Sequence, residues 1–316
     1  MRILVTGSSG FIATHLVRAL IRRGHLVHGM DTRRHGNWAD QPMFAPHTMD
    51  VTCISLLEEL FRQHRFDAIL HLAAGVGPEH VVADPYGTVA VNVQGTQNVL
   101  NLARRYSPQA RILFTSTSEV YGNCPDRPFN EDTSSLVLGP SQERRWCYAA
   151  SKISAEHLVL AQGGCVVRLF NTTGPGQSEE YVVPKFVGLA LRGEDITLYG
   201  DGSQVRCFCH VADTVAALVA LLNLMCQAPT GKHNDIFNIG SDTETTIAEL
   251  ALQVQEYVNS EIEVQIVAEP PEGSLTMPYR KPDLRKIAGA TGWFPQTPLE
   301  TIIKDITAWK VSGGKP

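Results

Sequence analysis

Along the first half of the chain, short apolar runs typical of buried strands alternate with stretches in which apolar residues recur at helical spacing. Short runs rich in β-branched residues predict buried strands at 3–6, 26–30, 68–72, 111–115 and 165–169, with a weaker strand at 47–51. Stretches with apolar residues at helical spacing predict helices at 11–23, 54–64, 89–106 and 148–162. Strands and helices that alternate in this way predict an α/β fold, a doubly wound parallel sheet with helices on both faces.

This alternation stops after residue 170, where glycine and proline become frequent. They cluster at 173–177, 200–202 and 269–282, and the short elements between them follow no repeating order. We therefore expect two domains. The larger is formed by 1–170 together with about 211–258, and the smaller, of mixed α/β structure, by about 171–210 and 259–316.

The composition is that of an ordinary globular protein. Of its 316 residues, 43% are hydrophobic and 19% are charged, and the net charge is −5. Because no basic stripe is present, we expect no nucleic-acid partner. No apolar run reaches the ~18–20 residues of a membrane helix, and the N-terminus lacks the features of a signal peptide. Seven scattered cysteines without a C-x-x-C pair predict free thiols in a reducing compartment, the cytoplasm, and no metal site.

A glycine-rich turn follows the first predicted strand and opens the first helix. In Gly7-Ser8-Ser9-Gly10-Phe11-Ile12-Ala13 the glycines allow a tight turn and a close backbone approach to a pyrophosphate, which the helix N-terminus attracts. The context of strand, turn and helix indicates a Rossmann-type dinucleotide site in the larger domain.

Asp31 ends the second predicted strand and selects the dinucleotide. A carboxylate there accepts both ribose hydroxyls and repels a 2′-phosphate, which favours NAD over NADP. The neighbouring Arg33 and Arg34 could instead bind such a phosphate, and Asp31 could simply cap a loop. Asp50 could bond the adenine amine or be an ordinary turn aspartate. The expected NAD-binding residues are Gly7, Gly10, Phe11, Ile12, Asp31, Asp50, Val51, Leu72, Ala73, Ala74, Tyr148 and Lys152.

Tyr148 and Lys152 lie four residues apart, on one face of a predicted helix. An ammonium group one turn away stabilises a phenolate, so we expect Lys152 to lower the pKa of Tyr148 from its usual ~10. Tyr148 could then remove a proton from a sugar hydroxyl while NAD takes hydride from the same carbon. The alternative, a surface pair on a helix, is less compatible with the glycine turn in the same chain.

Thr117, Ser118 and Glu119 follow the strand predicted at 111–115, at the sheet edge where open α/β folds bind ligands. Thr117 or Ser118 could hydrogen-bond the reacting hydroxyl. A simple dehydrogenase needs no carboxylate here, but an enzyme that also moves a proton at a neighbouring carbon does. Glu119 therefore predicts a second proton transfer, unless it only caps the next turn.

The whole pattern resembles the extended short-chain dehydrogenase/reductase family of NAD-dependent epimerases and dehydratases, over nearly the full length. Within it the chain is most similar to the UDP-glucuronate decarboxylases, or UDP-xylose synthases. The matching segments are Thr115 to Gly122, Leu138-Gly139-Pro140, Arg144-Arg145-Trp146-Cys147-Tyr148, Arg206-Cys207-Phe208, Arg280-Lys281-Pro282-Asp283 and Gly292-Trp293-Phe294-Pro295.

The resemblance implies a role for each matching residue. Tyr148 and Lys152 would carry C4 oxidation, and Thr117 would orient the sugar. Glu119 and Arg280 would serve decarboxylation and reprotonation. The residues implied to bind the UDP-sugar are Ser118, Arg145, Asn171, Arg206 and Arg280. A homodimer is also implied, through the helices at 89–106 and 148–162.

This chemistry requires such a set of groups in one site. Oxidation of C4 to a ketone makes a uronic acid a β-keto acid, whose carboxylate can leave as carbon dioxide. An acid must then reprotonate C5. The product would be UDP-xylose, or a UDP-4-keto-pentose if the ketone is not reduced again.

Two departures keep other reactions open. The decarboxylases usually carry arginine after the segment that matches Asn171 to Pro175, whereas this chain has Gly176-Gln177, as in many epimerases and dehydratases. It also lacks their tyrosine in 274–278. A nucleotide-sugar 4-epimerase or a 4,6- or 5,6-dehydratase is the alternative. A redox-sensing binding protein would need neither Tyr148 nor Glu119.

Overall fold

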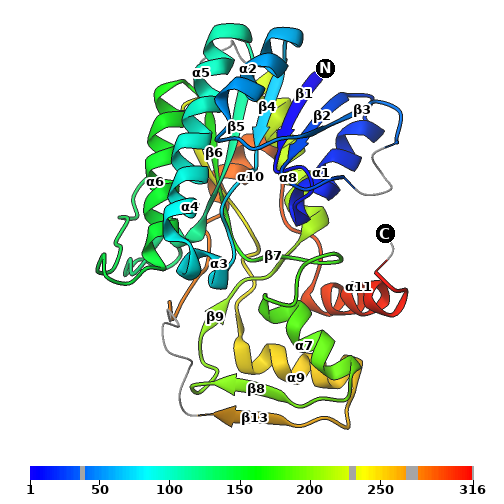
Figure 1. Ribbon diagram of the computed structural model, residues 1–316. Helices are drawn as coiled ribbons and strands as arrows, with labels where there is room; N and C mark the ends of the chain where they lie inside the picture. Colours follow the sequence, from blue (N-terminus) through cyan, green and yellow to red (C-terminus); the bar gives the residue numbers. More distant parts are fainter. Residues whose placement is uncertain (36–39, 228–232, 268–276, 315–316) are drawn as a thin grey trace.

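The computed structural model describes residues 1–35, 40–227, 233–267 and 277–314. Figure 1 shows a larger unit built around a twisted sheet and a smaller unit beneath it, with α11 at the side of the smaller unit. The departure at 274–278 falls mostly outside the described residues, since only 277 and 278 belong to them.

The larger unit contains a seven-stranded sheet in which every pair of neighbours is parallel, in the order β11-β6-β5-β4-β1-β2-β3. Its strands are β1 (Arg2–Thr6), β2 (Leu26–Asp31), β3 (Phe44–Thr48), β4 (Ala68–His71), β5 (Arg111–Thr117), β6 (Cys165–Leu169) and β11 (Ile236–Ile239). The direction of winding reverses between β1 and β4, and open α/β sheets bind their ligands at such a point. The doubly wound parallel sheet predicted from the sequence is confirmed.

Helices cover both faces of this sheet. Ile3 and Val5 point into a core shared with α1 (Phe11–Arg22) and α8 (Val211–Gln227), whereas Leu4 points to the opposite face. There α2 (Ile54–Gln63), α5 (Thr96–Tyr106) and α6 (Trp146–Ala161) form the second core. The strand predicted at 47–51 lies earlier, at 44–48, because Phe44 is buried while Asp50 begins a turn by accepting from the Thr52 N–H at 2.8 Å.

The helix predicted at 89–106 is divided into α4 (Pro85–Val89), the π-helical turn η1 (Ala90–Gly95) and α5. The side chain of Asn92, in the π turn, is fully buried. It accepts a hydrogen bond from Gly75 N at 2.9 Å and donates one to Ser151 Oγ at 2.9 Å. The π turn thus connects the loop after β4 with helix α6.

The smaller unit has its own core, formed by α7 (Val182–Leu191), α9 (Ile247–Val258) and α11 (Leu299–Val311) against β8 (Ile196–Tyr199) and β13 (Val264–Val267). The remaining elements are α3 (Pro78–Ala83), η2 (Ser118–Tyr121), β7 (Thr172–Thr173), β9 (Val205–Arg206), β10 (Cys209–His210), β12 (Thr245–Thr246) and α10 (Arg285–Thr291).

The two cores divide the chain differently from the sequence-based expectation. Helix α9 was expected in the larger domain, but its buried Leu250 and Val254 pack in the core of the smaller unit. Conversely, Ile287 of α10 and Trp293 pack in the larger unit's core beside α8. Trp293 also donates from its indole nitrogen to the Asp213 carbonyl at 3.1 Å. The chain therefore crosses between the units more often than composition indicates. Among the described helices, none is long and apolar enough to span a bilayer.

Candidate active site

A cavity of about 1490 Å³ receives side chains from both units. Its lining includes the start of α1, the end of β5, the N-terminal end of α6, the segment 171–183, Arg206 and Arg280. The predicted site residues that line it are Gly7, Gly10, Phe11, Ile12, Leu72, Thr117, Ser118, Glu119, Arg145, Tyr148, Asn171, Arg206 and Arg280. Asp31, Asp50, Val51, Ala73, Ala74 and Lys152 do not line it.

The glycine turn lies at the switch point between β1 and β4. Gly7 has φ +69°, and a Cβ there would lie 2.8 Å from the Ala73 Cα. A side chain is therefore excluded by conformation and by contact. Gly10 begins α1 with no side-chain cap, so the first N–H groups of the helix are left for another partner. These features fit the pyrophosphate of a dinucleotide.

Asp31 is held at the edge of this turn. Its carboxylate accepts from Ser9 N at 2.9 Å and from Arg33 N at 2.9 Å, and the Arg33 guanidinium donates to the Ser9 carbonyl at 2.9 Å. Asp31 therefore does cap the loop, and Arg33 is engaged in the same contact. Oδ1 also accepts from Arg33 Nε at 3.5 Å, whereas Oδ2, which accepts from Ser9 N, retains a lone pair for a ribose hydroxyl. Both roles are compatible.

Asp50 makes the contacts of a turn aspartate. One carboxylate oxygen, Oδ1, accepts from both the backbone N–H and the hydroxyl of Thr52, each at 2.8 Å. The carbonyl of Val51 accepts from the Asn98 amide at 3.0 Å. The turn is thus explained by contacts within the protein, and the role of Asp50 at the adenine stays a prediction.

Tyr148 and Thr117 meet through a side-chain hydrogen bond, at the junction of α6 and β5. Lys152 is 2% exposed, and its ammonium donates to the Thr115 carbonyl at 2.8 Å. Burial lowers the pKa of Lys152 to about 7. Burial, followed by the charge of Glu119, raises the pKa of Tyr148 above its usual value. Lys152 is not among the main groups that shift the pKa of Tyr148 in this arrangement, and its effect on the phenol stays a prediction.

Glu119 is paired with two arginines. Its Oε1 lies 3.5 Å from the Arg145 guanidinium and 3.5 Å from the Arg280 guanidinium. The side chain does not cap the following turn. That bond belongs to Thr117, whose Oγ1 accepts from Glu119 N at 3.2 Å. Glu119 therefore faces the cavity, next to Tyr148.

Arg206 adds a third positive charge. Burial lowers its pKa to about 9, and the charges of Arg280 and Arg145 contribute to this lowering. Burial also lowers the pKa of Arg280, which Glu119 partly opposes. Three guanidinium groups thus share one carboxylate. Such an excess of buried positive charge favours an anionic ligand.

Several lining residues were missed from the sequence. Tyr181, the N-cap of α7, lines the cavity, and the charge of Glu119 contributes to raising the pKa of its phenol. His15 on α1 contacts the Pro175 carbonyl at 2.9 Å and so joins the two units. Among described residues, buried polar atoms of Asn171, Thr173 and Gln177 have no hydrogen-bond partner. Within this segment the sequence had assigned a ligand-binding role only to Asn171 and had shown Gly176-Gln177 as a departure from the decarboxylases.

Comparisons with known proteins agree with this geometry. The pattern of the NAD dependent epimerase/dehydratase family matches residues 3–240. A UDP-N-acetyl-alpha-D-glucosaminuronate decarboxylase of Bacillus cytotoxicus is 33% identical over 98% of this chain and 97% of that protein. UDP-glucuronic acid decarboxylase 1 of Danio rerio is 36% identical over 95% of this chain and 70% of its own length.

Solved structures share the fold. A UDP-glucose 4-epimerase of Thermotoga maritima with UDP-glucose has a TM-score of 0.86 at 25% identity, over 100% of both chains. A UDP-glucose 4-epimerase of Thermus thermophilus in complex with NAD has a TM-score of 0.83 at 29% identity, over 98% of both chains. Decarboxylases and epimerases thus share one architecture, and side chains in the cavity must decide the reaction.

Proposed function

This chain belongs to the NAD dependent epimerase/dehydratase family, as its sequence motifs indicated, and from that premise we propose that it oxidises and decarboxylates a UDP-linked uronic acid. UDP-glucuronate is the proposed substrate, with UDP-xylose or a UDP-4-keto-pentose as the product. The observation that carries this proposal is the carboxylate of Glu119 between Arg145 and Arg280, next to Tyr148. Relatives named as decarboxylases, which match 98% and 95% of this chain, support it.

In the proposed first step, Thr117 and Tyr148 hold the C4 hydroxyl of the sugar. Tyr148 takes the hydroxyl proton. NAD, which the turn from Gly7 to Gly10 would hold, would supply the hydride acceptor for C4, and its positive charge would favour the phenolate. Lys152 keeps β5 and α6 in register through its bond to the Thr115 carbonyl. Thr117, at the end of β5, and Tyr148 on α6 are thereby kept within hydrogen-bond reach.

In the second step, the C5–C6 bond breaks and carbon dioxide leaves. The electron pair of that bond passes into the C4 carbonyl, giving an enolate. Arg280 and Arg145 orient the departing carboxylate by charge-assisted hydrogen bonds. Glu119 lies beside both guanidinium groups and faces the cavity, so it is placed to take up a proton from solvent and pass it to C5.

Product analysis tests this function. The protein with NAD is incubated with UDP-glucuronate and, separately, with UDP-N-acetylglucosaminuronate, the substrate in the name of one relative. Carbon dioxide and a UDP-pentose or its N-acetylated analogue are expected by mass spectrometry from at least one of them. A 4-epimer of unchanged mass would indicate an epimerase, and loss of water a dehydratase. Either result would replace decarboxylation as the function.

Glu119→Gln is the matched variant, since it keeps the size of the side chain and removes its acid–base function. We expect turnover to fall by at least ~10²-fold with unchanged NAD binding. Near-normal turnover would remove Glu119 from the mechanism.

We further propose that the protein is a cytoplasmic homodimer. All seven cysteines are free, as expected in a reducing compartment. On α4, beside α6, Tyr86 is 86% exposed and Val89 is 40% exposed, which supplies an apolar surface for a partner. Leu102 of α5, by contrast, is buried in the core. Light scattering of the purified protein tests the dimer, and Tyr86→Glu should shift it to monomer.

A further inference from the structure

We propose that Asn130 and Asp283 are positioning residues, which fix the segment 278–283 in the register that turns Arg280 into the cavity. Neither residue lines the cavity. They act through the backbone next to Arg280, and their importance rests on the role proposed above for that arginine.

The side chains of this segment alternate between two sides. Tyr279 and Lys281 both reach Glu244 on the outer side, at 3.1 Å and 3.0 Å respectively. Arg280, between them, is 7% exposed and contacts Glu119. In extended chain a shift by one residue exchanges the two sides. Such a slip would turn Arg280 outward and bring Tyr279 or Lys281 to the carboxylate site.

Backbone contacts hold the segment at both ends. Before Arg280, Val205 N donates to the Pro278 carbonyl at 2.9 Å, and Arg280 N donates to the Val205 carbonyl at 3.2 Å. After it, Phe129 N donates to the Lys281 carbonyl at 2.9 Å, and Asp283 N donates to the Phe129 carbonyl at 2.8 Å. The second pair depends on a loop, 129–134, that lies outside the named strands and meets this segment only through an isolated bridge between Phe129 and Pro282, so it needs further support from side chains.

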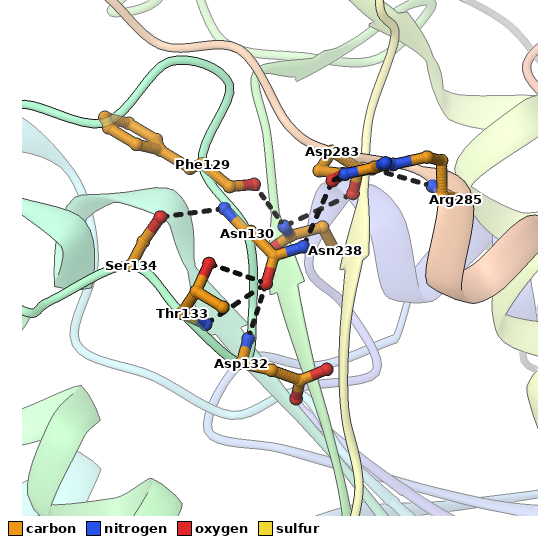
Figure 2. Close-up of polar contacts among 8 residues, drawn as sticks. All are labelled: Phe129, Asn130, Asp132, Thr133, Ser134, Asn238, Asp283 and Arg285. Atoms are coloured by element: carbon orange, nitrogen blue, oxygen red, sulfur yellow. Dashed lines mark hydrogen bonds and ion pairs between the residues drawn. The ribbon is translucent and has the colours of Figure 1, made fainter.

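Asn130 supplies that support, as Figure 2 shows. Its amide oxygen accepts from the backbone N–H groups of Asp132 and Thr133 at 2.9 Å and 3.1 Å, which folds the loop. Its amide nitrogen donates to Asp283 Oδ2 at 3.1 Å. One side chain therefore shapes the loop with its acceptor and fastens it to the Arg280 segment with its donor.

Asp283 is 5% exposed, and its carboxylate also accepts from Arg285 N at 3.0 Å and from the Arg285 guanidinium. Hydrogen bonds from Arg285 hold the pKa of Asp283 well below its usual range. The carboxylate is thus a fixed acceptor for Asn130. Because the Arg285 side chain is 87% exposed, its ion pair contributes little to the position of the backbone.

Asn238 connects this network to the turn that carries Glu119. Its fully buried amide donates to the Phe129 carbonyl at 3.0 Å and accepts from the Tyr121 hydroxyl at 2.9 Å. Tyr121 ends the η2 turn that contains Glu119. The two partners of the Glu119–Arg280 ion pair are therefore fixed to the same buried asparagine, one on each side.

A donor–acceptor exchange tests the proposal. Asn130→Asp keeps the loop-shaping oxygen and places a second carboxylate oxygen against Asp283. Asp283→Asn turns an amide donor toward the Asn130 donor. The double variant Asn130→Asp/Asp283→Asn restores the bond in the opposite direction. Arg285→Ala, which removes only the exposed ion pair, is the control.

The readout is the preference of the NAD-loaded protein for UDP-glucuronate over UDP-glucose, as a ratio of dissociation constants. All proteins carry Tyr148→Phe, so that no ligand is consumed. The two ligands differ at C6, where Arg280 is proposed to act. We expect the parent to prefer the carboxylate by about tenfold or more, and Arg280→Ala to abolish this preference. Each single variant, Asn130→Asp or Asp283→Asn, should lose most of the preference for UDP-glucuronate. The double variant should recover that preference to within about threefold of the parent. Arg285→Ala should keep it.

If Asn130 and Asp283 had a purely structural role, the variants would weaken the binding of both ligands equally and leave the ratio of their dissociation constants unchanged. An unchanged ratio in the single variants, with preference in the parent, would overturn the positioning role alone. If the double variant did not recover the ratio, the positioning role would also be overturned, without affecting the proposed function. A parent without preference would overturn the proposed function and this role with it. If Asn130→Asp does not fold, Asp283→Asn and its rescue give the same decision.

Discussion

Replacing His28 by glutamine will make the stability of the protein less sensitive to acid. His28 lies on β2, is 4% exposed, and its Nδ1 is 3.0 Å from His47 Nε2. Its ring also lies 4.4 Å from the ring of His64, centroid to centroid. Burial first, then the charges of His64, His47 and Arg2, lower the pKa of His28 to about 4.

The sign and size of the effect follow from proton linkage. In the unfolded chain a histidine has a pKa of ~6.5, so between pH 7.5 and 5 the unfolded state binds a proton that folded His28 refuses. The stabilisation is present above pH 6.5 and is lost as the pH falls toward 4. A folded pKa of about 4 gives a loss of about 2 kcal/mol at pH 5, and solvent screening reduces it to roughly 1 kcal/mol.

Urea unfolding at pH 7.5, 6.5, 5.5 and 5.0 measures this loss. The wild type and His28→Gln share the contributions of the histidines that do not contact His28, among them His71, whose pKa burial lowers to about 3. The difference between the two pH profiles therefore reports His28 together with its coupling to His47 and His64. We expect the free energy of unfolding of His28→Gln to fall by about 1–2 kcal/mol less than that of the wild type. Parallel profiles would refute the reasoning.

Two further predictions concern the dinucleotide turn and the helix that carries Tyr148. Gly7→Ala should abolish NADH binding in a fluorescence titration, because its Cβ would lie 2.8 Å from the Ala73 backbone, whereas Gly24→Ala, at a similar φ with open surroundings, should bind normally. Glu156→Gln should cost roughly 3–5 kcal/mol in thermal or urea unfolding, because it leaves Arg168 buried without its partner at 2.8 Å. The exposed ion-pair variant Glu58→Gln is the control, and an equal loss in both would contradict the role of burial.

The spacing of apolar residues and the residues of the turns predicted the larger unit well. The five apolar runs became β1, β2, β4, β5 and β6, because a parallel sheet buries both faces of its inner strands and leaves a continuous apolar signal, whereas β3, which is partly exposed, lies three residues before its weaker prediction. The π turn at 90–95 could not be predicted, since it exists to bring Asn92 to Gly75 and Ser151, which lie far from it in sequence. Helix α9 was assigned to the wrong unit for a similar reason: its amphipathic pattern shows that one face is buried, but not against which core.

In the site, residues at the ends of predicted strands and helices could be found because the fold itself brings them together. Thr117, Glu119 and Tyr148 are of this kind. Arg206 and Arg280 follow no periodic signal and were identified through resemblance alone. Tyr181 and His15 were missed, because a single tyrosine or histidine on an ordinary helix end or face carries no local mark. The effect of Lys152 on Tyr148 stays a prediction, since sequence spacing could not show that the ammonium also donates to the Thr115 carbonyl.

The charges of the cavity give a physical reason why substrate would switch the site on. Without ligand, burial and Glu119 keep Tyr148 protonated, and Glu119 itself is drawn to Arg145 and Arg280. A substrate carboxylate that pairs with Arg280 competes with Glu119 for the same guanidinium. In the proposed mechanism, binding would therefore release Glu119 toward C5 as it fixes the group that must leave. A neutral sugar would leave Glu119 in its ion pairs, so the arrangement favours anionic substrates in the proton-transfer step as well as in binding.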